Sequence, residues 1–213
     1  HLFDHIIKPI LLYGSDIWGF TLLKKGHIQL NQLAKDEVET CHIRFCRFAL
    51  GVSKKAPNVG IYGETGRYPL AIESILNTIK YWHRLQNIHE STLVHQAFNE
   101  MKHSNLVNSW YATVQSLLTR SNIKHDMAVK QVIKSIKTEL QGQFLSFWKK
   151  ILFDDTNKTG GNKLRSYRTY KNTFQQEEYL TLKSKAQRGD FSCKCPQVTN
   201  RNRKVREKGR KKR

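Results

Sequence analysis

Apolar residues recur every three to four positions along most of the chain, which is the period of an amphipathic α-helix. The longest such stretch covers residues 129–151. The same spacing predicts further helices over residues 3–11, 30–48, 72–82, 93–101 and 106–118. No run alternates apolar and polar residues convincingly, so strands are expected to be minor. The pattern predicts an all-α protein, an irregular bundle of about six or seven helices.

Glycine and proline residues indicate where these helices begin and end. Gly51 occupies the position of a helix C-cap, and Pro69 can open the next helix at its first position. Residues 53–66 between them are expected to form a Gly-rich connector. Pro9 predicts a kink in the first helix. A last, basic helix is expected near residues 164–174. Four aromatic residues are expected to anchor the core: Tyr13, Trp18, Trp82 and Trp110.

The charge of the chain is strongly positive and unevenly placed. The 213 residues include 37 Lys+Arg and 17 Asp+Glu, a formal net charge of +20. Residues 183–213 are poor in large apolar side chains and rich in charge, a composition that predicts a disordered basic tail. The remaining residues are also basic. Nucleic acid is the commonest polyanion that such a balance serves, because neutralised phosphates release counterions. The alternative is a solvated surface with a tail that acts as a nuclear address.

The candidate nucleic-acid contacts lie in the connector, at Arg67 beside it, and in residues 164–171. The connector contributes basic side chains, and residues 164–171 interleave basic with aromatic ones, so that aromatic faces can stack bases while cations hold phosphates. For residues 164–171 the competing interpretation is an amphipathic helix that docks Leu164, Tyr167 and Phe174 on the core, and both interpretations stay open. The candidate contacts are Lys54, Lys55, Arg67, Arg165, Arg168 and Lys171.

The chain offers no complete catalytic or metal site. Asp154 and Asp155 follow an aromatic residue as in polymerases, but they end a predicted helix rather than occupy the hairpin that aims paired carboxylates at two metal ions. Cys193 and Cys195 lack the two-residue gap of a zinc knuckle. We therefore expect no catalytic residue, no metal and no cofactor. No stretch is long and apolar enough to span a membrane.

Several short blocks follow one another in an informative order. Their sequences are KPILLYGSDIWG at residues 8–19, FCRFALGV at 45–52, YGETGRYPL at 62–70, KYW at 80–82 and LRSYRTYK at 164–171. In this order they resemble the region that follows the polymerase core of LINE-type (non-LTR) retrotransposon reverse transcriptases. The resemblance covers roughly residues 1–180.

The resemblance implies a parent protein with an endonuclease and an RNA-directed DNA polymerase, whose catalytic carboxylates would all lie before His1. This chain would then comprise the end of a thumb-like region and a long helix (1–52), a helical linker (53–182) and the basic tail (183–213). Its partners would be RNA or DNA, held mainly through phosphates, and the missing upstream polymerase domain. Members of that family often end in a Cys/His knuckle, from which Cys193 and Cys195 depart.

Two other interpretations stay open at this point. The first is a helical protein-interaction module with a nuclear-targeting basic tail. The second is a decayed genomic copy without a present function. The expected location is nuclear or cytoplasmic.

Overall fold

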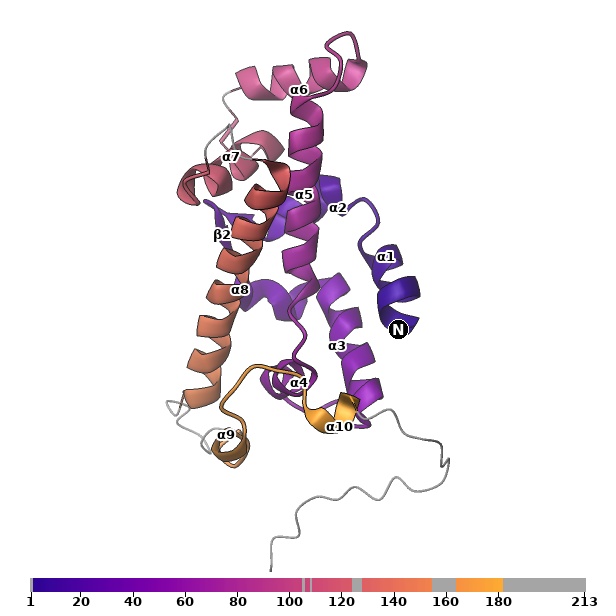
Figure 1. The fold of residues 1–213 in the computed structure, drawn as a ribbon, viewed down its shortest axis with the longest axis vertical. Helices are drawn as coiled ribbons and strands as arrows, with labels where there is room; N and C mark the ends of the chain where they lie inside the picture. Colours follow the sequence, from indigo (N-terminus) through magenta and orange to yellow (C-terminus); the bar gives the residue numbers. More distant parts are fainter. Residues whose placement is uncertain (1, 105, 108, 124–127, 155–163, 182–213) are drawn as a thin grey trace, which may run out of the picture. The chain divides into compact units, whose positions relative to one another are not determined.

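The computed structural model describes residues 2–104, 106–107, 109–123, 128–154 and 164–181 (Figure 1). The tail predicted over 183–213 lies outside the described residues, and so does Asp155. Residues His1–Thr181 form one compact unit. The proposed boundary at residue 52 stays a prediction.

Helical turns dominate the described residues, and the expected all-α class is confirmed. The first part of the chain consists of short elements, in which η marks a π- or 3-10 helix: η1 (Phe3–Ile7), α1 (Lys8–Leu11), α2 (Ser15–Trp18), η2 (Gly19–Leu22), β1 (Leu23–Lys24), β2 (His27–Ile28) and η3 (Leu30–Lys35). The remainder contains α3 (Glu37–Leu50), α4 (Asn58–Thr65), α5 (Leu70–Gln86), α6 (Leu93–His103), α7 (Trp110–Arg120), α8 (Val129–Phe153), α9 (Tyr167–Tyr170) and α10 (Glu178–Thr181). The two strands pair antiparallel as a minimal hairpin.

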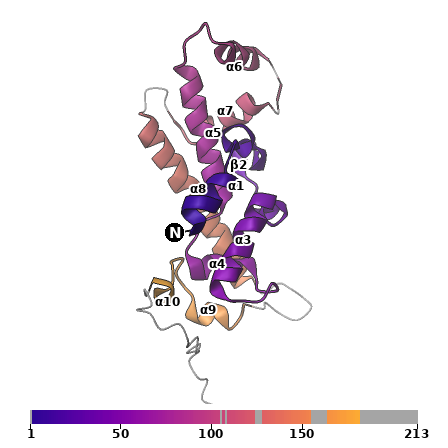
Figure 2. The same ribbon diagram turned by 90° about the vertical axis from the view of Figure 1, so that its right-hand side faces the viewer.

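Helix α5 is the central element, and the other long helices pack around it (Figures 1 and 2). Its Ile75 and Ile79 side chains are fully buried, and Trp82 anchors the core as predicted. Burial of each such side chain stabilises the fold by about 1.5–3 kcal/mol. Helix α8 confirms the predicted helix over residues 129–151. It buries a stripe that repeats every four residues, made of Val132, Ile136, Leu140, Phe144, Trp148 and Leu152.

Helix boundaries follow the expected chemistry with small shifts. Gly51 ends α3 at a φ of 64°, the left-handed conformation that favours glycine. Pro69 is the N-cap of α5 rather than its first helical residue. The irregularity expected at Pro9 takes the form of a π-helical turn just before it, in which the Lys8 N–H donates to the Phe3 carbonyl. Proline has no N–H to continue a regular ladder, which accounts for the break.

Four predictions about local structure are wrong. The helix expected over 30–48 is divided into η3 and α3, because the Asp36 side chain accepts a hydrogen bond from the Glu39 N–H and starts a new helix. Helix α4 occupies most of the expected connector. The basic helix expected over 164–174 is the single turn α9. Tyr13 is 87 % exposed and anchors no core. Among the described residues, no helix has the length and apolarity needed to cross a membrane.

Candidate nucleic-acid interface

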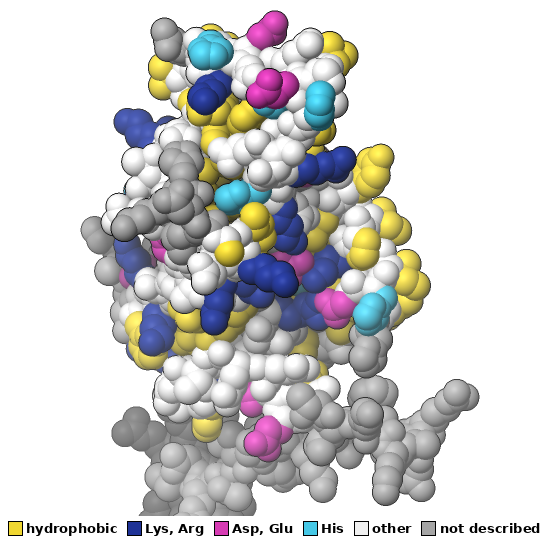
Figure 3. Space-filling view, turned by 45° about the horizontal axis from the view of Figure 1, so that its top comes forward, with side chains coloured by type: hydrophobic (Ala, Val, Ile, Leu, Met, Phe, Trp, Pro, Cys, Tyr) yellow, Lys and Arg dark blue, Asp and Glu magenta, His cyan; other side chains and the backbone are white. Residues whose placement is uncertain are grey.

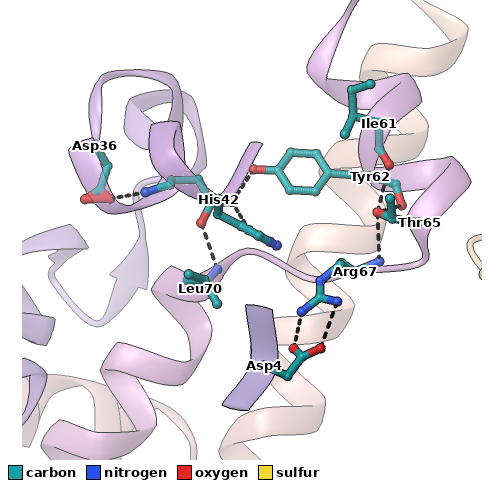
Figure 4. Close-up of polar contacts among 9 residues, drawn as sticks. Asp4, Asp36, His42, Ile61, Tyr62, Thr65, Arg67 and Leu70 are labelled. Atoms are coloured by element: carbon teal, nitrogen blue, oxygen red, sulfur yellow. Dashed lines mark hydrogen bonds and ion pairs between the residues drawn. The ribbon is translucent and has the colours of Figure 1, made fainter. Parts of the chain in front are cut away.

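A buried carboxylate joins three helices, α3, α4 and α5 (Figure 4). Glu39 of α3 is 1 % exposed. It accepts hydrogen bonds from the Tyr62 hydroxyl of α4 at 2.7 Å, from His42 Nδ1 at 2.8 Å and from the Leu70 N–H at 2.7 Å. Leu70 opens α5 behind a proline that offers no capping side chain, so Glu39 supplies the acceptor that this helix start needs. We call these four residues the Glu39 network.

The Glu39 network contains an ion pair sealed from solvent. Burial by itself lowers the pKa of His42, but the neighbouring Cys46 thiol and the hydrogen-bonded Glu39 carboxylate outweigh it and raise the pKa to about 9. His42 is therefore protonated at neutral pH and pairs with the Glu39 carboxylate. Burial, together with the charge of Glu39, raises the pKa of Tyr62, so its hydroxyl keeps the proton that it donates. Because these groups have no access to solvent, they link α3, α4 and the start of α5 rather than act on a substrate.

Arg67 is held by a second ion pair. Its guanidinium group donates two hydrogen bonds to the Asp4 carboxylate and lies 4.9 Å from the centre of the Phe3 ring. Burial acts to raise the pKa of Asp4, but the hydrogen bonds and charge of Arg67 lower it below its ordinary value. The structure thus gives the predicted phosphate contact at Arg67 an internal partner that links η1 to the α4–α5 corner. About 30 % of its side chain stays exposed.

The connector that carries Lys54 and Lys55 is pinned beside the start of α4. The Arg47 guanidinium group of α3 donates hydrogen bonds to the Ala56 carbonyl at 3.0 Å and to the Asn58 side chain. Both lysines are exposed. The contact at Arg47 therefore fixes where this pair of charges is displayed.

The α9 segment is fixed to the same helix. The Tyr167 hydroxyl donates to the Gly60 carbonyl of α4 at 3.3 Å, and Trp148 Nε1 of α8 donates to the neighbouring Val59 carbonyl at 2.8 Å. Arg165 is exposed, and Arg168 is half-buried. Tyr170 is 83 % exposed, so its ring is open to stacking. The connector therefore runs into α4, and the α9 segment is bonded to it. Both ribbon views place α4 and α9 at one end of this unit (Figures 1 and 2).

Lys171 does not belong to this surface. It is only 3 % exposed. Its ammonium group donates to the Gln175 carbonyl at 2.9 Å and pairs with Glu177. Six positions separate the two charges along the chain, and the segment after α9 turns back to bring them together. The prediction that Lys171 contacts phosphate is corrected to a structural role, because a buried, paired ammonium group is closed to a ligand.

Sequence reasoning missed the residues that position this surface. Glu39, His42 and Cys46 share one face of α3 at intervals of three and four, so the signal was a carboxylate on the apolar side of a predicted helix. Arg47 lies on the same helix, and its role is to hold the connector. Within the described ranges, no group of three or more His, Cys, Asp or Glu side chains is arranged to hold a metal ion.

We found no match for this chain among protein-family models, among curated proteins or among solved structures. Its function must therefore be argued from its own residues.

Proposed function

We propose that this chain binds single-stranded RNA or DNA through phosphates, without catalysing a reaction itself. The observation that carries the proposal is the shared anchorage of two basic segments. Lys54, Lys55 and Arg165 are all exposed. The connector leads directly into α4 and is held by Arg47 of α3, which also bonds to Asn58 at the start of α4, whereas the α9 segment bonds to Gly60 of α4. We call these three residues together with Tyr170 the α4 surface. It pairs cations with an exposed aromatic ring, the combination that single-strand-binding proteins use.

The overall charge supports the same conclusion. The net charge of +20 provides long-range attraction for a polyanion. Lys and Arg side chains also gather in a band across the face drawn in Figure 3.

We further propose that the chain is the C-terminal, post-polymerase part of a non-LTR retrotransposon reverse transcriptase. The support is the ordered set of sequence blocks given above. Two of these blocks, residues 62–70 and 164–171, meet in the structure, because the Tyr167 hydroxyl lies against the backbone of Gly63. In this proposal the chain holds template RNA or target DNA while the upstream polymerase domain performs the chemistry.

The test is a salt titration of binding to a labelled single-stranded RNA, followed by fluorescence anisotropy with the full chain. A variant with Lys54→Gln, Lys55→Gln and Arg165→Gln removes three phosphate contacts. We expect the slope of log affinity against log salt to fall by about 2, because each phosphate contact on a single strand contributes about 0.7.

The matched control removes the same charge elsewhere. Lys130, Lys134 and Lys137 are exposed on the outer side of α8. Their replacement by glutamine should change the slope by clearly less than the first variant does. Equal slopes for both variants would show that the attraction is diffuse and that the α4 surface is wrongly assigned.

A second candidate function, a protein-interaction module, is favoured by an apolar stripe near the start of the chain. The stripe is exposed and runs from η1 and α1 across the turn at Gly14 into α2. It consists of Leu2, Ile6, Ile10, Tyr13 and Ile17. Exposed apolar surface of this kind is typical of protein contacts, and an amphipathic partner helix would fit it. A chain that ends at residue 182 separates the two candidates. Saturable, salt-sensitive RNA binding without the tail supports the first, and its complete loss supports the second.

A further inference from the structure

A groove lined by side-chain amides lies between α5, α6 and α7. It encloses about 380 Å³, a volume typical of small-ligand sites. It is lined by Gln86, His95, Phe98, Asn99, Lys102, Tyr111 and Gln115. Gln86 and Gln115 also border an adjoining hollow of about 430 Å³ beside Trp82. We call the first of these the amide groove.

The three amides of the groove are open to a ligand. Within the described part of the chain, the side chains of Gln86, Asn99 and Gln115 form no hydrogen bond to another residue. Each amide offers both donors and an acceptor. A ligand with no polar edge would leave these groups unpaired, and an unpaired polar group removed from water is costly. The groove therefore suits a ligand that presents donors and acceptors side by side.

Two aromatic residues, Phe98 and Tyr111, are among those that line the groove. Tyr111 is half-buried and lies 4.6 Å from Trp82 and 5.6 Å from Phe98, measured between ring centres. These contacts hold the Tyr111 ring in place. Burial raises the pKa of Tyr111, so its hydroxyl stays protonated. A rigid ring beside open amides can stack a planar, polar ligand.

The charge at the groove favours an anionic ligand. Lys102 is exposed and adds a positive charge. None of the described residues that line the groove is a carboxylate. A phosphate near Lys102 would thus meet attraction without local repulsion.

We propose that the amide groove binds an unpaired nucleobase of a single-stranded nucleic acid, with its polar edge on the amides and its face against Tyr111. This inference rests on the proposed function and deepens it. Planar shape, a row of donors and acceptors and an attached phosphate together define a nucleotide within a strand. The groove lies between α5, α6 and α7, at the end of this unit opposite to α4 (Figures 1 and 2), so a strand held at both places would run along the unit.

The test compares base-bearing oligomers with abasic oligomers of about 16 nucleotides, the upper range of site sizes for single-strand-binding folds. RNA and DNA versions of each are measured by fluorescence anisotropy with the full chain. The variant carries Gln86→Leu and Gln115→Leu. We expect it to lose about tenfold in affinity for base-bearing strands and to keep its affinity for abasic strands. The control carries Gln96→Leu and Gln131→Leu, two exposed glutamines outside the groove, and should behave as the unsubstituted chain.

The outcomes separate the two proposals. Strand binding that does not depend on the bases, or an equal loss on both kinds of strand, overturns the amide groove and leaves the α4 surface standing. A chain that binds neither kind of strand overturns the proposed function, and the groove assignment fails with it. Tenfold loss on RNA alone shows that the bound base is recognised together with its ribose 2′-hydroxyl.

Discussion

The substitution Glu39→Gln tests whether the Glu39 network holds the fold together. Glutamine has nearly the same shape but carries no charge and one acceptor oxygen fewer. If its oxygen takes the place of Oε1, it still accepts from Tyr62 and His42, but its NH₂ group then faces the Leu70 N–H, another donor. The first N–H of α5 loses its acceptor, and the buried His42 loses the carboxylate that compensates its charge.

The expected cost follows from these losses. A buried donor left without a partner costs about 1–3 kcal/mol, and the removal of one partner from a buried ion pair costs about 3–5 kcal/mol. These two costs do not add in full, because His42 can lose its proton and so remove the unpaired buried charge. We therefore expect the free energy of unfolding to fall by about 3 kcal/mol, a large share of the 5–15 kcal/mol that stabilises a typical domain.

Urea unfolding at pH 7, followed by circular dichroism at the helix band, measures this change. With a slope of about 2 kcal/mol per molar urea, the midpoint should fall by about 1.5 M. The control is Glu73→Gln, which breaks the more exposed ion pair with Lys8. Such surface pairs contribute at most about 1 kcal/mol. A loss below 1 kcal/mol for Glu39→Gln, or equal losses for both variants, would refute the reasoning.

Three further predictions concern other parts of the unit. The pKa of His42 is about 9 in the fold against about 6.5 in an unfolded chain. The contribution of protonated His42 to the free energy of unfolding is therefore complete below pH 6.5 and is lost as the pH rises toward 9. Unfolding midpoints measured between pH 6 and 9.5 should show this loss. Gly63→Ala places a methyl carbon 2.6 Å from a tyrosine hydroxyl and should lower the free energy of unfolding by about 1 kcal/mol. Gly142→Ala meets no neighbour within 4 Å and should raise the free energy of unfolding by about as much. Urea midpoints that shift in opposite directions confirm this prediction, and a gain at both sites contradicts it. The double change Ile10→Ser and Ile17→Ser lies on the exposed stripe and should change the melting temperature by no more than about 4 °C; a larger drop would mean that this stripe is buried.

The long amphipathic helices could be predicted from the sequence because their burial repeats at a regular interval. Helix α8 buries a side chain every fourth residue over its whole length, and that pattern is visible without any structure. Helix α4 could not be predicted in the same way. It contains Gly60 and Gly63, both poor helix formers, and Gly63 is tolerated there because Trp148 and Tyr167 approach its backbone closely. That approach depends on residues distant in sequence.

The candidate nucleic-acid contacts also depend on residues that are distant in the sequence. The sequence shows which side chains are positively charged, but it does not show which of them are buried. Lys54 and Arg165 are exposed as a binding surface requires, whereas Lys171 is buried against Glu177. The sequence alone treats all three as equivalent cations. Only the path of the chain after α9 distinguishes them.

Substitutions that change the stability of this unit should differ from those that change its binding to a nucleic-acid strand. The Glu39 network is sealed from solvent, so Glu39→Gln removes no charge that a phosphate could reach, and the salt slope should stay unchanged under conditions where the variant is folded. The lysines of the α4 surface are exposed and form no ion pair in the described structure, so their replacement should alter the slope and leave the urea midpoint in place. If the two sets of variants instead changed both quantities together, the α4 surface would be part of the structural support, and the basic surface and the scaffold could not be assigned separate roles.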